Sequence, residues 1–310
     1  MGNALFIGAA CIDVVIYLDA LPKTEEDIHP KKQVMSLGGC ALNAASAAML
    51  VCDHVTLASP VGTGVFGELT ERKLTERGIP VRIRSEEENG CCYCFVEKSG
   101  ERTFLSVHGA EYTFHRESMR ELDKAVYDYV YVCGLEVEEP TGSDLLDYLS
   151  EFPDRQIVYC PGPRGAVLKG KNQRMLRKEP ILHLNEKEAV VMAQTLYGKP
   201  FKNFYAAAEY LFSATGKPVV VTRGERGVYC KGEDFLLEIP SKKAPVVNTI
   251  GAGDTHAGVL IGCLCNGMNW GAALETANLW AERAVASEEA VPRKAASFRP
   301  NPLQLSPEFC

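Results

Sequence analysis

Two glycines around one small residue, followed by a carboxylate, are the part of this sequence best suited to chemistry. They lie in the stretch Asn248–Thr255, which reads N-T-I-G-A-G-D-T. The residues after it predict a helix with one apolar face, formed by Ala257, Leu260, Ile261 and Leu264. Gly251, Ala252 and Gly253 are therefore expected to present backbone N–H groups at a helix N-terminus, where an anion is favoured.

Asp254 would repel an anion bound at this turn unless it has a chemical role. A carboxylate beside a phosphate site can accept the proton of a hydroxyl group that attacks the phosphorus. An anion hole with an adjacent base is what phosphoryl transfer to an alcohol requires. The alternative, from the residues alone, is that Asp254 only caps the helix.

The stretch Asn248–Thr255, together with His256, resembles the C-terminal signature of the ribokinase-like (PfkB) carbohydrate kinases, Asp-Thr-x-Gly-Ala-Gly-Asp-Thr-Phe. Asn248 stands in place of the first Asp and His256 in place of the Phe. The resemblance implies an ATP-dependent kinase that phosphorylates a primary hydroxyl group of a sugar, with Asp254 as the base. It extends from about Leu5 to Ala290, with the motifs in the family's order.

A second motif, Gly38-Gly39-Cys40-Ala41-Leu42-Asn43, precedes a helix of small residues. Glycines allow close backbone approach to a ligand, and the Asn43 amide can both donate to and accept from a hydroxyl group. The motif resembles the family's Gly-Gly-x-x-x-Asn signature, which implies that Gly38, Gly39 and Asn43 contact the acceptor. Taken alone, it is more typical of a helix start with a packing glycine pair.

Two acidic residues are candidates for the acceptor site because each follows a predicted strand. Asp13 follows the first strand, and ligands bind beyond the carboxyl ends of strands in open parallel sheets. Glu136 follows the strand expected at 129–133. The resemblance implies a sugar contact for Asp13 and a sugar or metal-side contact for Glu136, whereas the position of Asp13 alone is also typical of a solvated turn Asp. Gly64 stands where the family usually carries an Asp.

Asn185 and Glu188 resemble the family's Asn-x-x-Glu motif, which is associated with magnesium and phosphate. Because Mg²⁺ keeps most of its waters and needs one or two protein oxygens, the resemblance implies that these two residues hold it through water. The same spacing predicts a capping box at a helix N-terminus, and the two roles are compatible.

The remaining nucleotide contacts are expected after the strand at 219–223. Thr222, Gly224 and Gly227 resemble the family's Thr-x-Gly-x-x-Gly segment, which lies along ATP, although the pattern alone is ordinary turn chemistry. Asn278 lies on a late helix where the family often places a residue beside the adenine.

Potassium is left open as a further cofactor. Ribokinase-like relatives build a monovalent cation site partly from the Asp that Asn248 replaces. Residues 286–290 also lack the glycine-containing loop that usually completes this site.

Composition excludes several classes of protein. The chain has 310 residues, with 46% hydrophobic and 24% charged residues and a net charge of −7. Such an acidic chain without a basic cluster is not expected to bind nucleic acid, and no apolar run is long enough to span a membrane. The twelve cysteines lack a second paired unit at zinc spacing, and Cys91–Val96 reads as a strand, so we expect unpaired thiols in a reducing cytoplasm.

Apolar runs alternate with helical segments, which predicts an α/β fold with a doubly wound, mostly parallel sheet. Strands are expected at 4–9, 55–59, 129–133, 156–160, 181–184 and 219–223. Helices are expected at 41–51, 66–76, 143–152, 186–196, 205–215 and 270–286. No linker divides the chain, so residues 1–310 are read as one domain. Its last stretch, 291–310, is expected to be an irregular tail.

Two extended stretches interrupt this alternation, at about 12–37 and 82–108. In the family that the chain resembles, such insertions form a small β-sheet lid over the sugar, and pairing of lids makes a homodimer one of the expected assemblies.

Three alternatives stay open for the function. The acceptor could instead be a nucleoside, since Asn in the first position of the signature is similar to pseudouridine kinases and some nucleoside kinases. A sensor that binds sugar or nucleotide on a kinase fold is a second class, which the intact Asp254 argues against. A dehydrogenase lacks support because no GxGxxG follows the first strand.

Overall fold

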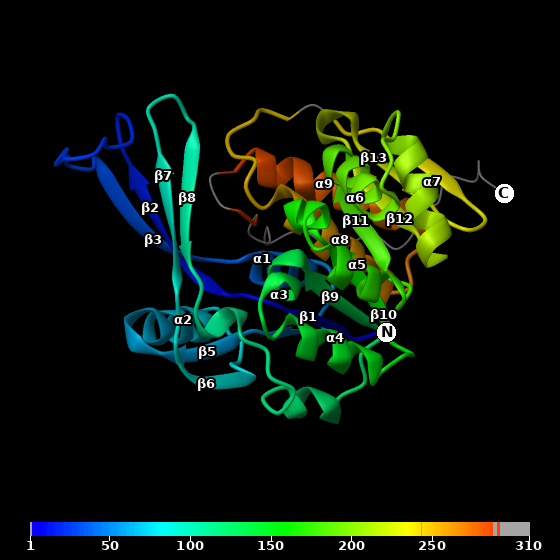
Figure 1. Cartoon of the computed structure of the whole chain (residues 1–310), viewed down its shortest axis with the longest axis horizontal. Helices are drawn as coiled ribbons and strands as arrows, with labels where there is room; N and C mark the ends of the chain where they lie inside the picture. The colour runs from blue at the N-terminus through cyan, green and yellow to red at the C-terminus, as the bar shows by residue number, and fades with distance from the viewer. Residues whose placement is uncertain (1, 243, 288–289, 292–310) are drawn as a thin grey trace.

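The computed structural model describes residues 2–242, 244–287 and 290–291. Its centre is an eight-stranded sheet (Figure 1). In spatial order the strands are β14 (Leu236–Ile239), β13 (Val228–Lys231), β12 (Val219–Thr222), β11 (Ile181–Asn185), β10 (Gln156–Cys160), β9 (Tyr129–Cys133), β1 (Ala4–Ile7) and β4 (Val55–Ala58). The strands from β12 to β4 run parallel, whereas β13 and β14 form an antiparallel edge.

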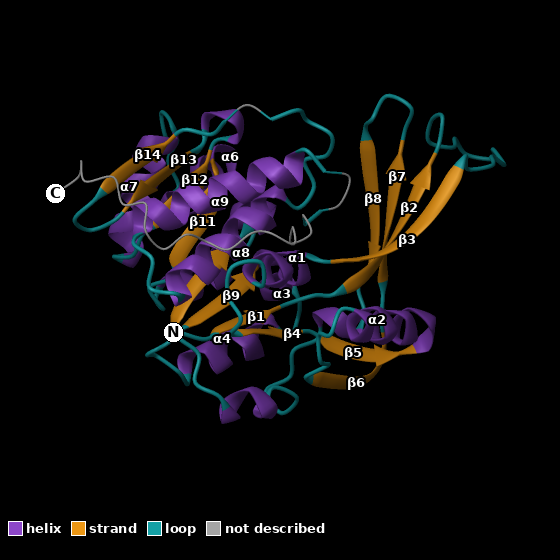
Figure 2. Cartoon of the chain, turned by 180° about the vertical axis from the view of Figure 1, so that it is seen from behind, coloured by secondary structure: helices purple, strands orange, loops and turns teal. Residues whose placement is uncertain are grey.

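Helices cover both faces of this sheet, because successive residues of a buried strand point to opposite sides. Phe6 packs into the core on one face, while Leu5 and Ile7 pack into the core on the other. The first face carries α1 (Cys40–Ala48), α8 (Ala252–Cys265) and α9 (Trp270–Val285) (Figure 2). The second carries α4 (Gly142–Ser150), α5 (Lys169–Leu176), α6 (Glu186–Tyr197) and α7 (Phe204–Thr215). The predicted doubly wound fold is confirmed.

Helix α8 differs from the expected amphipathic helix, because it is buried on all sides from Thr255 to Cys265. It packs between α1 and α9, and its approach to α1 is unusually close. A Cβ atom at Gly258 would lie 2.0 Å from the carbonyl oxygen of Ala44, so only glycine fits there. The small residues of α1 thus bring the start of α8 close to the start of α1.

The lid is a four-stranded sheet that projects from one side of the body (Figures 1 and 2). Its strand order is β3 (Lys32–Gly38), β2 (Cys11–Tyr17), β7 (Cys91–Val96) and β8 (Arg102–Val107). The second lid segment, which was predicted at about 82–108, therefore starts later than expected, at the lid strand β7. Strand β6 (Ile83–Glu88) pairs instead with β5 (Pro60–Thr63) in a separate two-stranded sheet, beside α2 (Gly64–Glu76).

All the strands and helices expected from the sequence are present, with ends that differ by a few residues. Strand β7 carries the cluster Cys91–Cys94 as predicted, and no group of metal-binding side chains occurs within the described residues. None of the helices in the described ranges is long and apolar enough to cross a membrane. The expected tail lies outside the described residues, apart from Val291.

Candidate active site

A cavity of about 310 Å³ lies at the carboxyl ends of four neighbouring parallel strands. The last residues of β9, β10, β11 and β12 all line it: Cys133, Cys160, Asn185 and Thr222. Gly253 and Asp254, at the N-terminus of α8, line it as well. Ligands bind at this edge of open α/β sheets, and here a helix N-terminus adds an environment that favours anions.

Asp254 does not cap its helix, so the capping alternative is wrong. The N-cap of α8 is Gly251, which has no side chain to offer, and Asp254 Oδ2 accepts a hydrogen bond of 3.1 Å from Asn43 Nδ2. Burial raises the pKa of the Asp254 carboxyl to about 6, the bond from Asn43 opposes this shift, and the charge of Glu188 adds to it. A carboxylate held in this way is suited to accept a proton near neutral pH.

The hydrogen bond between Asn43 and Asp254 links two residues that line different cavities. Asp254 lines the cavity described above, whereas Asn43 lines a second, larger cleft of about 1220 Å³ between the lid and the body. Asp13 and Gly38 line this cleft too, so three of the predicted acceptor residues come together. Asp254 therefore lies where the cleft and the cavity meet.

Asp13 lies within strand β2, so the alternative of a solvated turn residue is wrong. It is paired with Ser36 of β3, and its side chain lies so close to Gly38 that a Cβ atom there would be 2.0 Å from Oδ2. Burial raises the pKa of the Asp13 carboxyl to about 6. Gly39 is the N-cap of α1 with a φ of 107°, and it does not line the cleft.

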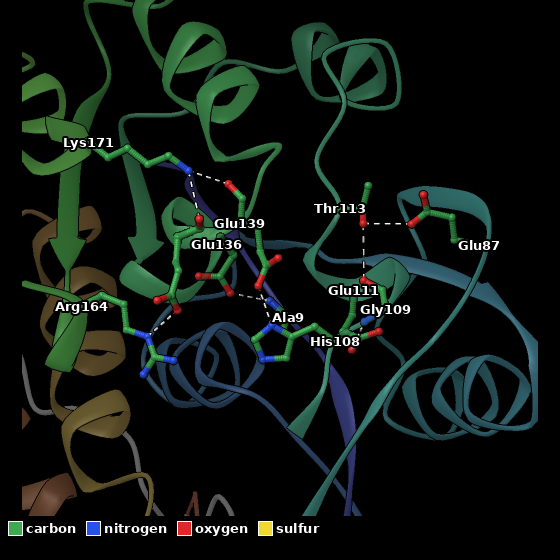
Figure 3. Close-up of polar contacts among 11 residues, drawn as sticks. Ala9, Glu87, His108, Gly109, Glu111, Thr113, Glu136, Glu139, Arg164 and Lys171 are labelled. Carbon is green, nitrogen blue, oxygen red and sulfur yellow. Dashed lines mark hydrogen bonds and ion pairs between the residues drawn. The ribbon is translucent and has the colours of Figure 1, made fainter. Parts of the chain in front are cut away.

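Glu136, on α3 (Gly134–Glu138), has a structural role that the sequence did not indicate. Its side chain is fully buried and lines neither cavity, and Oε1 accepts a hydrogen bond of 2.9 Å from the backbone N–H of Ala9 (Figure 3). Burial raises the pKa of this carboxyl group. Glu136 therefore fixes the loop between β1 and the lid strand β2, and direct contact with an acceptor stays a prediction.

Asn185 and Glu188 form the capping box that their spacing predicted. Asn185 Oδ1 accepts from the backbone N–H of Glu188, and Glu188 Oε2 accepts from that of Asn185, both at 2.9 Å. Both residues also line the cavity beside Asp254. The capping box engages Oε2 and not Oε1 of Glu188, so a carboxylate oxygen is left to interact with a hydrated Mg²⁺, and the donor set fits that ion.

The other predicted nucleotide residues are more dispersed. Thr222 lines the cavity, whereas Gly224 and Gly227 lie in the turn after β12, both with positive φ, and line neither cavity. Asn278 is buried, and its Nδ2 donates to the carbonyl oxygen of Ile239 at 3.2 Å. A contact between Asn278 and an adenine stays a prediction.

A comparison with models of known protein families identifies the family of this chain. The model of the pfkB family carbohydrate kinases matches residues 1–294. The chain belongs to this family.

Similar proteins agree with this assignment. The chain is 32% identical over 276 residues to the uncharacterized sugar kinase YegV of Escherichia coli (strain K12), with 86% of this chain and 83% of that protein covered. Its fold matches the crystal structure of ribokinase from Thermotoga maritima with a TM-score of 0.81 at 20% identity, covering 95% and 97% of the two chains. It also matches a nucleoside kinase of Burkholderia thailandensis in complex with inosine, with a TM-score of 0.74 at 17% identity, covering 94% and 95%. The chain is thus a phosphotransferase of the pfkB carbohydrate kinase family, with an alcohol group as acceptor.

Arg164 is a residue of this pfkB kinase that the sequence analysis missed. It lies in the short turn Gly162–Ala166 after β10. Among the described residues that line the cavity beside Asp254, it is the one with a Lys or Arg side chain. Its Nε donates to Glu138 Oε2 at 2.7 Å (Figure 3), which leaves the terminal nitrogens for other acceptors. The arginine following Pro161-Gly162-Pro163 at the end of a predicted strand was a signal that could have identified it.

His256, which replaces the Phe of the family signature, contacts a second histidine. Its Nδ1 lies 2.8 Å from Nε2 of His183 on β11, and both rings are buried. Burial lowers the pKa of His183 to about 4, so the pair is neutral near pH 7 and one ring donates to the other. The contact ties the start of α8, two residues after Asp254, to the strand that carries Asn185.

Proposed function

We propose that this kinase transfers the γ-phosphoryl group of ATP to a primary hydroxyl group of a sugar, either free or as part of a nucleoside. In this proposal the cleft beneath the lid binds the acceptor, and the cavity beside Asp254 binds the phosphates of ATP; we call them the acceptor cleft and the phosphate-side cavity. The observation that carries the proposal is the hydrogen bond between Asn43, in the acceptor cleft, and Asp254, in the phosphate-side cavity. In the reaction the hydroxyl proton passes to Asp254, the hydroxyl oxygen forms a bond to the γ-phosphorus, and the bond from that phosphorus to the bridging oxygen breaks to release ADP.

The groups around Asp254 supply what the transfer requires. Gly253, the second residue of α8, lines the cavity, and its backbone N–H group would face the developing negative charge on the phosphoryl oxygens. Gly251 and Ala252 line neither cavity, and the Ala252 N–H donates to the carbonyl oxygen of Thr249 at 3.4 Å, so their part in this anion site stays a prediction. The guanidinium group of Arg164 adds a permanent positive charge on the cavity wall. Asn185 and Glu188 would hold Mg²⁺ through water, and when bound the ion offsets the charge of the phosphates.

Two further groups bind the acceptor in this proposal. Asp13 accepts hydrogen bonds from sugar hydroxyls at the base of the lid, and Asn43 orients the reacting hydroxyl group. Ser46, one helical turn after Asn43, also lines the cleft, and its buried Oγ has no hydrogen-bond partner within the described part of the chain. This makes its hydroxyl a third acceptor-binding group that the sequence did not indicate.

The pH dependence of kcat should report the raised pKa of Asp254. Only the carboxylate can accept a proton, so kcat is expected to fall about tenfold per pH unit below about pH 6, whereas a base with an ordinary Asp pKa would remain active to about pH 4. The measurement is kcat at saturating substrates across the acidic to neutral range. The Asp13→Asn variant serves as a control, since it should retain this inflection in kcat. An inflection that disappears with Asp13→Asn would contradict the assignment to Asp254.

Potassium is expected to stimulate this enzyme little. Asn248 Oδ1 accepts from Arg102 Nη1 at 3.0 Å and from the backbone N–H of Ile250 at 2.9 Å, so a guanidinium charge already lies beside the position of the family's Asp. Like charges repel, and a neutral amide attracts K⁺ less than a carboxylate does. Asn248→Asp should increase the dependence on K⁺. The check is the initial rate against K⁺ concentration at constant ionic strength, and strong activation of the unmodified protein would refute the prediction.

The test of the function is a screen for ADP release with ATP and Mg²⁺ over free sugars and nucleosides, with and without K⁺. Phosphorylation of at least one acceptor at its primary hydroxyl group, identified by mass spectrometry and NMR, is the expected result. Measurable binding of sugar or nucleotide without any ADP release would favour the sensor alternative.

A further inference from the structure

The side chain of Arg102 reaches from the lid to the body of the protein. Arg102 is the first residue of β8, the edge strand of the lid sheet that lies toward the body (Figures 1 and 2). Its Nη1 donates a hydrogen bond of 3.0 Å to Oδ1 of Asn248. Both residues line the acceptor cleft, and neither lines the phosphate-side cavity. The bond therefore connects the lid with the opposite wall of the cleft without entering the cavity.

Asn248 belongs to the segment that leads into α8. Its Oδ1 also accepts a hydrogen bond of 2.9 Å from the backbone N–H of Ile250, and its own backbone N–H donates to the carbonyl oxygen of Val285 at 3.1 Å. An amide oxygen has two lone pairs, which here face the N–H donors of Arg102 and Ile250. The orientation of the Asn248 amide is thus set jointly by the lid and by the backbone of the turn before α8.

The turn at Ile250 sets where α8 begins. The next residue, Gly251, is the N-cap of α8, and its carbonyl oxygen accepts the first hydrogen bond of the helix, from the backbone N–H of Thr255 at 2.7 Å. Gly253 and Asp254 lie inside this first helical turn, and both line the phosphate-side cavity. A displacement of the turn would therefore move the anion-binding N–H group and the base together.

We propose that Arg102 is a positioning residue for phosphoryl transfer, which couples the position of the lid to the start of α8 through Asn248. Arg102 can hold Asn248 only when β8 lies against this side of the cleft, so a lid closed over an acceptor also orders the turn where the phosphates bind. Acceptor and nucleotide then favour each other's binding by linkage. The inference rests on the proposed kinase reaction for the role of this turn, and it requires no contact of Arg102 with either substrate.

Lys32 provides a matched control. It lines the same cleft from β3, at the opposite edge of the lid sheet, where its Nζ lies 5.6 Å from the centroid of the Tyr17 ring. Replacing either cation by methionine removes one positive charge from the lid side of the cleft. Arg102→Met also removes the hydrogen bond to Asn248, so a difference between the two variants reports that bond and not the loss of charge.

The test measures backbone hydrogen exchange at 247–255 and the affinity for MgADP by calorimetry, in the unmodified protein, Arg102→Met, Arg102→Lys and Lys32→Met. Arg102→Met should exchange faster in this segment. It should also bind MgADP about 10-fold more weakly, the size expected for loss of one hydrogen bond from a charged group. Arg102→Lys keeps a charged donor and should recover part of the affinity, whereas Lys32→Met should change neither quantity. Thermal unfolding shows that each variant is folded.

The variant Asn248→Ala tests whether Arg102 acts through Asn248. Because the two residues share one contact, Arg102→Met should not weaken MgADP binding further in a protein that already carries Asn248→Ala. Losses that multiply in the double variant would mean that Arg102 acts on the nucleotide by another route, and this would overturn the proposal.

The outcomes separate this inference from the proposed function. A change in neither exchange nor affinity in Arg102→Met, a change in one of them alone, or an equal loss in Lys32→Met would overturn the coupling and leave the kinase reaction standing. The expected effects of Arg102→Met without ADP release from any acceptor would overturn the reaction and leave the link between the lid and the nucleotide site standing.

Discussion

Asp254→Asn is expected to lower turnover by about 10²- to 10⁴-fold while leaving ATP binding nearly unchanged. The substitution keeps the shape of the side chain and its contact with Asn43, but an amide cannot accept the hydroxyl proton. It should not weaken the fold either. Because the folded-state pKa of Asp254 is raised to about 6, its charged form destabilises the folded protein above that pH, and a neutral side chain removes this cost.

The measurements are kcat, ATP affinity and thermal unfolding at neutral pH, for Asp254→Asn and for Asp147→Asn as the control. Asp147 forms an exposed ion pair with Arg174 at 2.8 Å and lines neither cavity, so the same chemical change there should leave kcat unaffected. A folded Asp254→Asn protein with near-normal turnover would show that another group takes the proton.

The sequence predicted those strands that consist of consecutive apolar residues, because such strands are buried on both faces. Strand β9 is one such run, since Tyr129–Cys133 is apolar throughout and lies between neighbours on both sides. Strand β6 could not be read in this way, because Ile83 is followed by Arg-Ser-Glu-Glu-Glu and the strand exists through its pairing with β5. Strands β13 and β14 have four residues each, too short a pattern to identify from the sequence, and they pair with β12 and with each other at the antiparallel edge of the sheet.

The candidate site was predictable to the extent that its residues end strands or begin helices. Four of the predicted residues come together because the ends of parallel strands meet at one edge of the sheet. They are Gly253, Asp254, Asn185 and Thr222. Burial behind the cavity could not be predicted from the sequence, so the hydrogen bond from the Ala9 backbone N–H to the buried Glu136 was not expected. The interpretation also overlooked contacts between distant segments, such as the pair His183–His256.

Gly253→Val is expected to reduce ATP affinity and turnover without reducing stability. A Cβ atom at Gly253 would meet no protein atom within 4 Å, so a larger side chain has room in the protein alone. Gly253 is the second residue of α8, and valine is more favourable than glycine in a helix. The open space in front of this turn is where the phosphate must approach the backbone N–H groups. Blocking it should lower kcat/KM for ATP by about 10²- to 10³-fold, the range found for removal of a donor to a developing oxyanion.

Gly271→Val is the matched control for this prediction. Gly271 is the second residue of α9, it lines neither cavity, and a Cβ atom there would meet only Asn269 Oδ1, at an ordinary contact distance of 3.5 Å. Both substitutions make the same change at the same helix position, so they should affect thermal unfolding alike, while only Gly253→Val affects ATP. Because nothing in the protein itself occupies the space at Gly253, a loss of affinity there reports a ligand and not a packing defect. Unchanged affinity and turnover in Gly253→Val would mean that no phosphate binds at this turn, and the role assigned to Asp254 would then lose its geometric basis.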